Sequence, residues 1–299
     1  MSARARVRAA LLLGGIAIGF AAIFFRLAAP TDPLLASALR LAIAGLVLSP
    51  HALRAVQDGR LSMHATRVAA ACGVLYAIHF GAWVASLDRT SVAASVTIVT
   101  ATPLLLAAIA FVRGRDRPTR VTTIAAITAA VGATIIGVGD ASEAGWGALS
   151  GDLLAGLGAV AMAVYVLVVR ELGRIPALAF SGIAALSGAA TLVLVVLALS
   201  RFTTLTPPDE HALLFIALAA LVPQVIGHGA LTWALEHASP TEVGLATAIE
   251  PVIATLLAWM VFAERPSATV GAGATLTLAA VVGGVLASRG NAGVDAPSR

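Results

Sequence analysis

The sequence predicts an all-α integral membrane protein with ten transmembrane helices, arranged as two inverted five-helix repeats with both termini cytoplasmic. Three observations lead to this prediction. Of the 299 residues, 59% are hydrophobic and 11% are charged, and the mean hydropathy is +0.96. Soluble domains are about 45–50% apolar and about 25% charged. The apolar residues fall into ten runs long enough to cross a bilayer, and the two halves of the chain match each other in sequence.

This composition excludes several classes of protein. A water-soluble chain this apolar would expose hydrophobic surface and aggregate, which excludes a cytosolic enzyme, a secreted disulfide scaffold and a disordered protein. The single cysteine, Cys72, cannot form an intramolecular disulfide. The net charge of +4 comes from short clusters of arginine between apolar runs, a pattern typical of membrane topology and not of a surface that binds nucleic acid. The lipid bilayer is therefore the expected environment.

Each span needs roughly 20 apolar residues at 1.5 Å per residue. The first span follows three arginines, as a signal peptide would, but its apolar run is long and no soluble chain follows, so we expect it to be retained. Asp32-Pro33 and Ser239-Pro240-Thr241-Glu242 carry the capping residues of a helix start. The ten predicted spans are 9–29, 33–50, 68–87, 91–112, 121–139, 151–169, 177–199, 212–235, 240–262 and 267–288.

The arginines also predict the orientation, because cytoplasmic segments carry an excess of positive charge. Fourteen arginines fall on the side of the N-terminus, and four, namely Arg26, Arg89, Arg201 and Arg265, fall on the other side. Both termini are therefore expected in the cytoplasm. The alanine-rich, lysine-free composition is typical of a GC-rich genome, so we expect a multi-pass protein of a bacterial inner (plasma) membrane.

The halves repeat at an offset of 148 residues. Gly81-Ala82 matches Gly229-Ala230, Pro103 matches Pro251, and the acid-Arg-Pro trio that begins at Asp116 matches the one at Glu264. Because each half has an odd number of spans, the second copy enters the membrane from the opposite side, as in many secondary transporters. The predicted domains are 9–139, 151–288 and a flexible C-terminal tail at 289–299. The alternatives are an inert scaffold and an enzyme that happens to be duplicated.

Five further segments of the sequence form a recognisable pattern, namely Leu34–Ala42 with Arg40, Ser91–Pro103, Gly151–Leu154, Glu250-Pro251 and Glu264–Pro266. With these segments the chain resembles the drug/metabolite transporter superfamily in its ten-helix EamA form, over nearly its whole length. Within the superfamily the nearest resemblance is to the YddG-like exporters of amino acids. The resemblance implies a central cavity lined by helices 1, 3, 4, 6, 8 and 9.

Polar and aromatic residues near the middle of the third span are candidates for the wall of that cavity. Tyr76, His79 and Trp83 recur at i, i+3 and i+7 and so share one helical face. Their rings can stack on an amphipathic solute while their N–H and O–H groups orient it. The alternative is that the rings pack between helices and that His79 bonds to a backbone carbonyl.

Other cavity candidates lie in the second half. Gln224 and His228 are four residues apart on one face of span eight, beside Pro223 and Gly227. They are placed either to bind a substrate or to join two helices by hydrogen bonds. Tyr165 lies near the end of span six, where cavity lining and a place in the interfacial aromatic belt are both consistent with the sequence.

Two charges and two prolines lie deep inside spans. Arg40 and Glu250 are near mid-depth, where an isolated charge is costly. They form either a structural ion pair, or a site for a substrate carboxylate, or a proton-coupling site. Pro103 and Pro251 occupy matched positions and are expected to kink their helices, either as hinges or as static bends.

The function predicted from these features is secondary transport of small amphipathic metabolites by alternating access. The resemblance to the YddG-like exporters implies that the substrates are amino acids, including aromatic ones, and that they are exported. A drug or cation exporter of the same fold and a facilitator or channel remain as alternatives. The chain has no nucleotide-binding loop, zinc-protease motif or nucleophile elbow, so we expect neither an enzyme nor a cofactor or metal. The expected partners are a small-molecule substrate and lipid, and the sequence leaves monomer and homodimer open.

Overall fold

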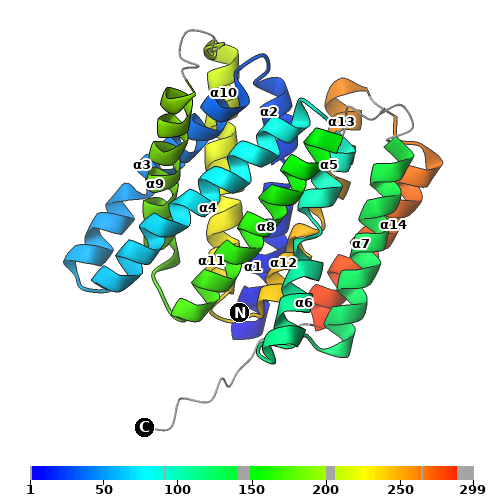
Figure 1. Ribbon diagram of the computed structural model, residues 1–299. Helices are drawn as coiled ribbons and strands as arrows, with labels where there is room; N and C mark the ends of the chain where they lie inside the picture. The colour runs from blue at the N-terminus through cyan, green and yellow to red at the C-terminus, as the bar shows by residue number, and fades with distance from the viewer. Residues whose placement is uncertain (1, 91, 141–148, 200–205, 264, 288–299) are drawn as a thin grey trace.

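The computed structural model describes residues 2–90, 92–140, 149–199, 206–263 and 265–287, and all regular elements in these ranges are helical (Figure 1). Glu264 and the predicted tail 289–299 lie outside them. The first repeat contains α1 (Ala3–Ile18), α2 (Ala21–Leu27), α3 (Pro33–Gln57), α4 (Met63–Leu87), α5 (Val92–Val99), α6 (Thr102–Arg113) and α7 (Arg120–Asp140). The second contains α8 (Leu149–Leu172), α9 (Ala177–Ala198), α10 (Glu210–Ala219), η3 (Ala220–His228), α11 (Gly229–Ala234), α12 (Pro240–Thr247), α13 (Glu250–Phe262) and α14 (Ala268–Ala287).

These elements confirm the predicted spans. Nine helical segments of the described chain are long and apolar enough to cross a membrane, and α7, at the position of predicted span five, contains a further apolar stretch at Arg120–Ile136. Three boundaries are wrong by five residues or more. Span one begins at Ala3 and not at residue 9, span three begins at Met63 and not at residue 68, and span two continues past Pro50 to Gln57. A proline removes the N–H that would bond to the carbonyl four residues earlier. Here the Ser49 hydroxyl donates to that Leu46 carbonyl oxygen at 2.8 Å, so the helix continues through the proline.

The prolines of spans four and nine lie at full interruptions of their helices. α5 ends at Val99 and α6 begins at Thr102, while α12 ends at Thr247 and α13 begins at Glu250. The two interruptions are therefore related by the same 148-residue offset as the sequence repeat. Pro103 and Pro251 occupy the first turn of α6 and α13, where a missing N–H leaves no carbonyl without a partner.

The other interruptions do not follow the repeat. Span one is divided between α1 and α2, whereas its counterpart α8 is continuous. Span eight contains the π-helical segment η3 around Pro223, whereas its counterpart α4 is continuous. π-helical segments inside α-helices are frequent at functional sites, and η3 carries His228 and Gln224. Neither departure from the repeat was predicted from the sequence.

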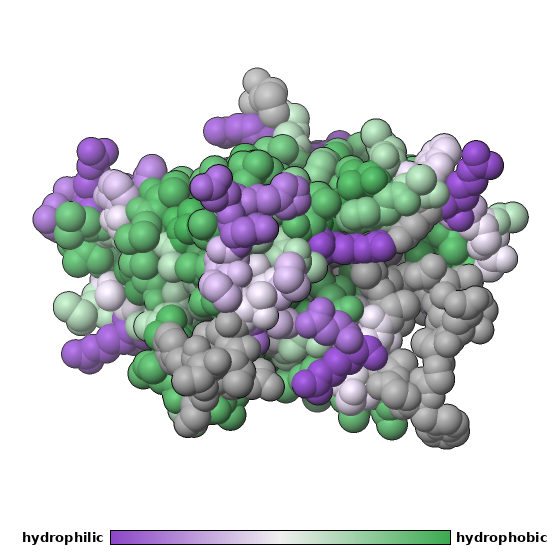
Figure 2. Space-filling view, turned by 90° about the horizontal axis from the view of Figure 1, so that it is seen from above, coloured by the Kyte–Doolittle hydropathy of each residue, from purple (hydrophilic) through white to green (hydrophobic). Residues whose placement is uncertain are grey.

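The two ends of the bundle are chemically distinct from its sides. The beginning of α1 and the end of α14 lie at one end, where Arg8 donates to the carbonyl oxygen of Leu286. We call this the terminal end. Hydrophilic side chains lie on the opposite end, with apolar ones between them (Figure 2). Between the ends, large apolar side chains are exposed, as lipid contact requires. Examples are Leu46, Ile124, Leu153, Leu194 and Met260.

α7 and α14 pack side by side at one margin of the bundle (Figure 1), and glycine allows their close approach. A Cβ added at Gly132 would lie 2.8 Å from the carbonyl oxygen of Gly273 and would press against the Thr277 hydroxyl. We therefore expect Gly132→Ala to reduce stability by about 1–3 kcal/mol through overpacking. Gly271→Ala on α14 is the matched control, because a Cβ there meets no atom within 4 Å. Thermal melting in detergent tests this prediction, which would be contradicted if the two variants had the same melting temperature.

Candidate functional site

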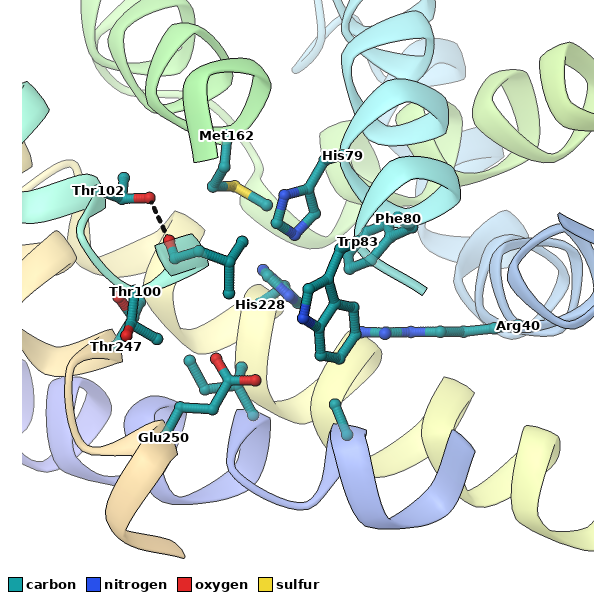
Figure 3. A pocket seen from close by; sticks show the side chains of 13 residues that line it. Arg40, His79, Phe80, Trp83, Thr100, Thr102, Met162, His228, Thr247 and Glu250 are labelled. Atoms are coloured by element: carbon teal, nitrogen blue, oxygen red, sulfur yellow. Dashed lines mark hydrogen bonds between the residues drawn. The ribbon is translucent and has the colours of Figure 1, made fainter. Parts of the chain in front are cut away.

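A small cavity lies at the centre of the bundle, and its volume is about 40 Å³. A water molecule needs roughly 10–15 Å³ measured in this way, so the cavity has room for about three waters. Its wall combines charged, aromatic and hydroxyl side chains with a few apolar ones (Figure 3). The lining residues are Ile18, Ala21, Arg40, His79, Phe80, Trp83, Val99, Thr100, Thr102, Met162, His228, Thr247 and Glu250.

Spans one, three, four, six, eight and nine all contribute to this wall, which is the set that the resemblance implied. Span two departs from it, because Arg40 of α3 also lines the cavity. A hydrogen bond between α3 and α4 explains this position. The Ser37 hydroxyl donates to the carbonyl oxygen of Phe80 at 3.2 Å, and Arg40 follows one turn later on the same face of α3.

The Arg40 side chain is completely buried, and its three guanidinium nitrogens have no hydrogen-bond partner within the described chain. The guanidinium carbon lies 4.1 Å from the ring centre of Phe80 and 5.5 Å from that of Phe25. Such cation–π contacts compensate part of the cost of burying the charge. The donor groups of this cationic side chain, which lines the cavity, are thus not used by the described part of the protein.

Glu250 enters the same cavity from another side, at the start of α13 (Figure 3). A direct Arg40–Glu250 ion pair, one of the arrangements expected from the sequence, is not formed, since none of the Arg40 nitrogens has a hydrogen-bond partner. The physical reason is that Arg40 lies along the rings of Phe80 and Phe25, while Glu250 is held on α13 across the cavity. The two charged side chains therefore line the same cavity without forming an ion pair across it.

The aromatic part of the wall comes from α4 and η3. His79 Nδ1 lies 2.8 Å from the carbonyl oxygen of Gly158. A carbonyl oxygen only accepts, so Nδ1 carries the proton and Nε2 is the acceptor nitrogen of the neutral ring. The Trp83 ring lies parallel to His79, with ring centres 6.4 Å apart, and its indole Nε1 has no hydrogen-bond partner in the described ranges. The rings of His228 and Phe80 are nearly perpendicular, and their centres are 5.4 Å apart.

Three threonines at the helix interruptions form the remaining polar wall. Thr102 donates to the Val99 carbonyl oxygen at 2.8 Å, and Thr247 donates to that of Gly244 at 2.7 Å. Thr100 bonds to the carbonyl of Val96 at 2.7 Å. These hydroxyls satisfy carbonyls at the ends of α5 and α12. Sequence reasoning missed them, although their positions next to matched prolines were a usable signal.

Tyr76, Tyr165 and Gln224 do not line this cavity. Tyr76 stacks on Tyr165 with ring centres 4.4 Å apart, and the Tyr165 hydroxyl lies 3.3 Å from that of Thr232. Gln224 is 2% exposed, and its Oε1 has no partner among the described residues. Because Tyr165 is nearer than Met162 to the terminal end of α8, the stacked pair forms a packed layer on that side of the cavity.

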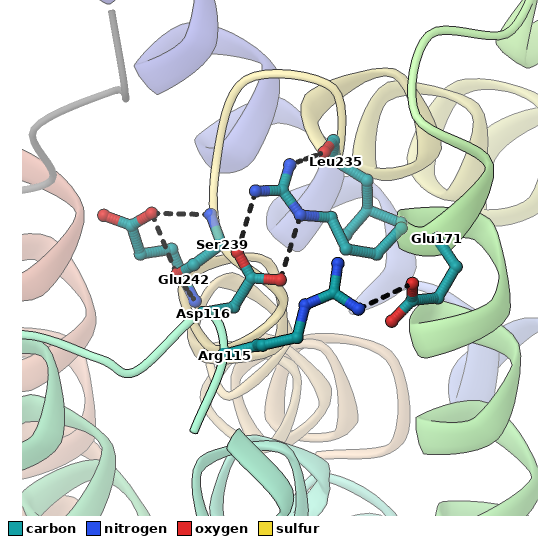
Figure 4. A network of polar contacts seen from close by, with 7 residues as sticks. Arg115, Asp116, Glu171, Leu235, Ser239 and Glu242 are labelled. Atoms are coloured by element: carbon teal, nitrogen blue, oxygen red, sulfur yellow. Dashed lines mark hydrogen bonds and ion pairs between the residues drawn. The ribbon is translucent and has the colours of Figure 1, made fainter. Parts of the chain in front are cut away.

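A network of ion pairs closes the terminal end (Figure 4). Arg170 of α8 donates to both carboxylate oxygens of Asp116, at 2.9 and 3.3 Å, and to the carbonyl oxygen of Leu235 at 2.8 Å. We call these three residues the terminal clamp. Arg113 and Arg115 also bind Glu171, at 2.7 and 3.3 Å. The clamp links the segment after α6 in the first repeat to α8 and α11 in the second.

The comparison with known families agrees with this geometry. The model of the EamA-like transporter family matches residues 8–138 and again residues 149–286. The chain belongs to the EamA-like transporter family. One solved crystal structure shares 18% sequence identity with it, covers 96% of this chain and 99% of its own, and superposes with a TM-score of 0.77, which shows the common fold. No curated protein matches the chain by sequence.

Membership confirms several expectations. This EamA-like protein is a multi-pass membrane protein and a transporter of small substrates, with two repeats that match one family model. The family model spans all ten helices and separates the halves near residues 139–148. The central cavity described above lies between elements of both repeats and is therefore the candidate substrate site of this EamA-like transporter.

Proposed function

We propose that this EamA-like transporter exports amino acids, including aromatic ones, by alternating access. The observation that supports this best is the buried Arg40 guanidinium, which faces the central cavity with no hydrogen-bond partner in the described part of the chain. A buried charge left in this way is destabilising, so its retention favours a ligand that completes it. A carboxylate matches the planar fork of donors best.

The opposite side of the cavity suits the other half of an amino acid. Glu250 lines the same cavity as Arg40. A substrate ammonium group placed between Glu250 and the Thr100 and Thr247 hydroxyls would meet one carboxylate and two hydroxyl oxygens, all of which accept hydrogen bonds. A zwitterion bound in this way satisfies both buried charges at once. The Trp83 indole N–H is a further donor available to the substrate carboxylate.

The aromatic wall suits the side chain of such a substrate. His79, Trp83 and Phe80 present ring faces and edges along one side of the cavity, and rings of this kind stack on planar apolar groups.

At about 40 Å³ the cavity is too small for a whole amino acid, so binding requires the wall to widen. We assign this widening to the half-helices that meet at Pro103 and Pro251, which carry four of the lining residues nearby.

Alternating access requires a closure on each side of the site. On the terminal side the Tyr76–Tyr165 stack and the terminal clamp lie in succession between the cavity and the end of the bundle. We propose that Tyr76 and Tyr165 contact the substrate as it passes this layer, and not in the central cavity itself. Gln224 precedes the cavity residue His228 by one turn, on the side away from the terminal end, and we propose that it contacts the substrate there. We propose that these two layers close the terminal side in the conformation described here.

The orientation is part of the proposal, because export is defined relative to the cytoplasm. The arginine distribution favours a cytoplasmic terminal end, in a bacterial inner membrane. We expect a cysteine at Arg60, placed in a Cys72→Ser background, to resist an impermeant thiol reagent in intact cells. A cysteine at Pro207 is expected to react. The reverse labelling pattern would contradict the proposed orientation.

The experiment that tests the substrate class is counterflow in proteoliposomes with three indole compounds. Tryptophan carries both charges, tryptamine lacks the carboxylate, and indole-3-propionate lacks the ammonium group. We expect saturable counterflow of tryptophan that the two analogues fail to support or to inhibit, because each leaves one buried charge unsatisfied.

The same experiment separates the alternatives. Transport of tryptamine without tryptophan would identify a cation exporter that uses Glu250 alone. Flux of all three compounds without saturation would identify a facilitator or channel. A pH gradient applied across the same liposomes shows whether transport is coupled to protons, with Glu250 as the candidate proton-carrying group.

A further inference from the structure

A second hollow lies on the side of the bundle, towards the end opposite to the termini. It is a groove of about 600 Å³ and shares no lining residue with the central cavity. Small residues of α4 form its floor, namely Ala77, Gly81, Ala82 and Ala85. Larger apolar side chains from α3, α4, α8 and α9 form its walls, among them Leu34, Ile78, Leu154, Leu157, Leu192 and Leu199.

The length of the groove matches one leaflet of a bilayer. Along α4 it runs from Ala77 near mid-helix to Arg89 just beyond the helix end, which corresponds to about 18 Å at 1.5 Å per residue. Half of a hydrocarbon core of about 30 Å is about 15 Å. A groove of this length, open along an apolar side of the protein, fits an acyl chain that reaches from the interface to the bilayer centre.

Among the described residues that line the groove, three are charged, and all three lie at its interfacial mouth. They are Asp32, Asp88 and Arg89. Asp32 is fixed there because its Oδ1 accepts from the backbone N–H groups of Leu34 and Leu35, at 2.9 and 3.2 Å. Burial, together with the neighbouring Asp32 carboxylate, raises the pKa of Asp88 above its ordinary value. A cation bound at this mouth would relieve the repulsion between the two carboxylates.

We propose that this groove binds one phospholipid whose head group carries a primary ammonium. One acyl chain lies on the small-residue floor of α4. The head-group ammonium lies between the carboxylates of Asp32 and Asp88, and the phosphate meets the guanidinium of Arg89. Charge complementarity at the mouth and the one-leaflet length of the apolar part together select this occupant over a peptide or a second copy of the chain.

Native mass spectrometry of the whole protein tests the proposal. The protein is taken from nanodiscs that contain phosphatidylethanolamine, phosphatidylcholine and phosphatidylglycerol with identical chains. We expect one retained phosphatidylethanolamine per protein. Ala82→Leu, which fills the floor, is expected to lower its retention by about tenfold or more. Asp88→Asn, which removes one carboxylate, is expected to lower it roughly fivefold, because a charge at the interface contributes about 1 kcal/mol.

Ala108→Leu is the matched control, because Ala108 is an exposed alanine of α6 outside the groove, and it is expected to retain the lipid. Equal retention of the three lipids, or unchanged retention in Ala82→Leu and Asp88→Asn, would overturn the proposal. Thermal melting shows whether Ala82→Leu folds, and Asp88→Asn decides the question if it does not, because Asp88 is exposed and lies after the end of α4.

Discussion

Arg40→Met is expected to remove amino-acid transport while leaving the protein folded and no less stable. The substitution deletes the donors that we assign to the substrate carboxylate, and charge-assisted hydrogen bonds of this kind contribute about 1.5–3 kcal/mol each. The loss in counterflow rate should therefore be about a hundredfold or more. Stability should not fall, because replacing a buried charge that lacks a hydrogen-bond partner by an apolar chain is often neutral or stabilising.

Arg54→Met on the same helix is the control, since Arg54 is exposed at the terminal end of α3 and should transport normally. Arg40→Lys keeps the charge but not the planar fork, so we expect it to recover only part of the activity. If Arg40→Met instead unfolds and Glu250→Gln restores its melting temperature, the two residues form a structural pair and the assigned role of Arg40 is wrong.

Asp116→Asn is expected to open the terminal end of the transporter. Its carboxylate accepts both hydrogen bonds from Arg170, whose side chain is only 15% exposed, so the pair is shielded from water more than the other ion pairs of the described chain. Loss of about 1.4 kcal/mol from this closed state raises the open population about tenfold. A cysteine at Met162, in a Cys72→Ser background, should then react about tenfold faster with a reagent added from the terminal side.

Arg60→Gln provides the comparison for the clamp. It breaks the Arg60–Asp58 pair, which lies at the same end but has both side chains 58% exposed. Exposed pairs of this kind contribute little to stability. We expect no change in the reactivity of the cysteine at Met162. An equal increase in both variants would mean that the clamp does not control access.

The spans could be predicted from the sequence because length and hydropathy are sufficient to recognise a membrane helix. Helix interruptions could be predicted only where a proline marked them, as at Pro103 and Pro251. The division of span one at Gly19–Phe20 is marked by no proline. Pro223 marks a disturbance of span eight but does not specify the π-helical form of η3, since tertiary packing decides which backbone hydrogen bonds are exchanged there. Pro50 misled the prediction because the compensating Ser49 hydroxyl acts only in the folded helix.

The candidate site could be predicted in part for a related reason. Buried polar residues are conspicuous in an apolar span, so Arg40, Glu250, His79, Trp83 and His228 were all recognisable. The face of each helix that meets the cavity could not be recognised, because lipid and protein interior are equally apolar and leave no clear polar stripe along the helix. For this reason Tyr76 and Tyr165 were predicted to line the cavity although they do not, and the threonines that do line it were missed.

The unequal interruptions of the two repeats bear on how the carrier treats its two faces. If both halves bent at matched places, the inward-facing and outward-facing forms would be related by a twofold rotation and equally populated without substrate. Here α4 and α8 are single rods, while their counterparts are α10–η3–α11 and α1–α2, so this degeneracy is lifted. Apparent affinity scales with the populated fraction of the competent form, so under the proposed alternating access we expect the half-saturation concentration to differ between the two membrane sides. The gradient still dictates the direction of net flow, but the carrier responds to it over different concentration ranges on each side.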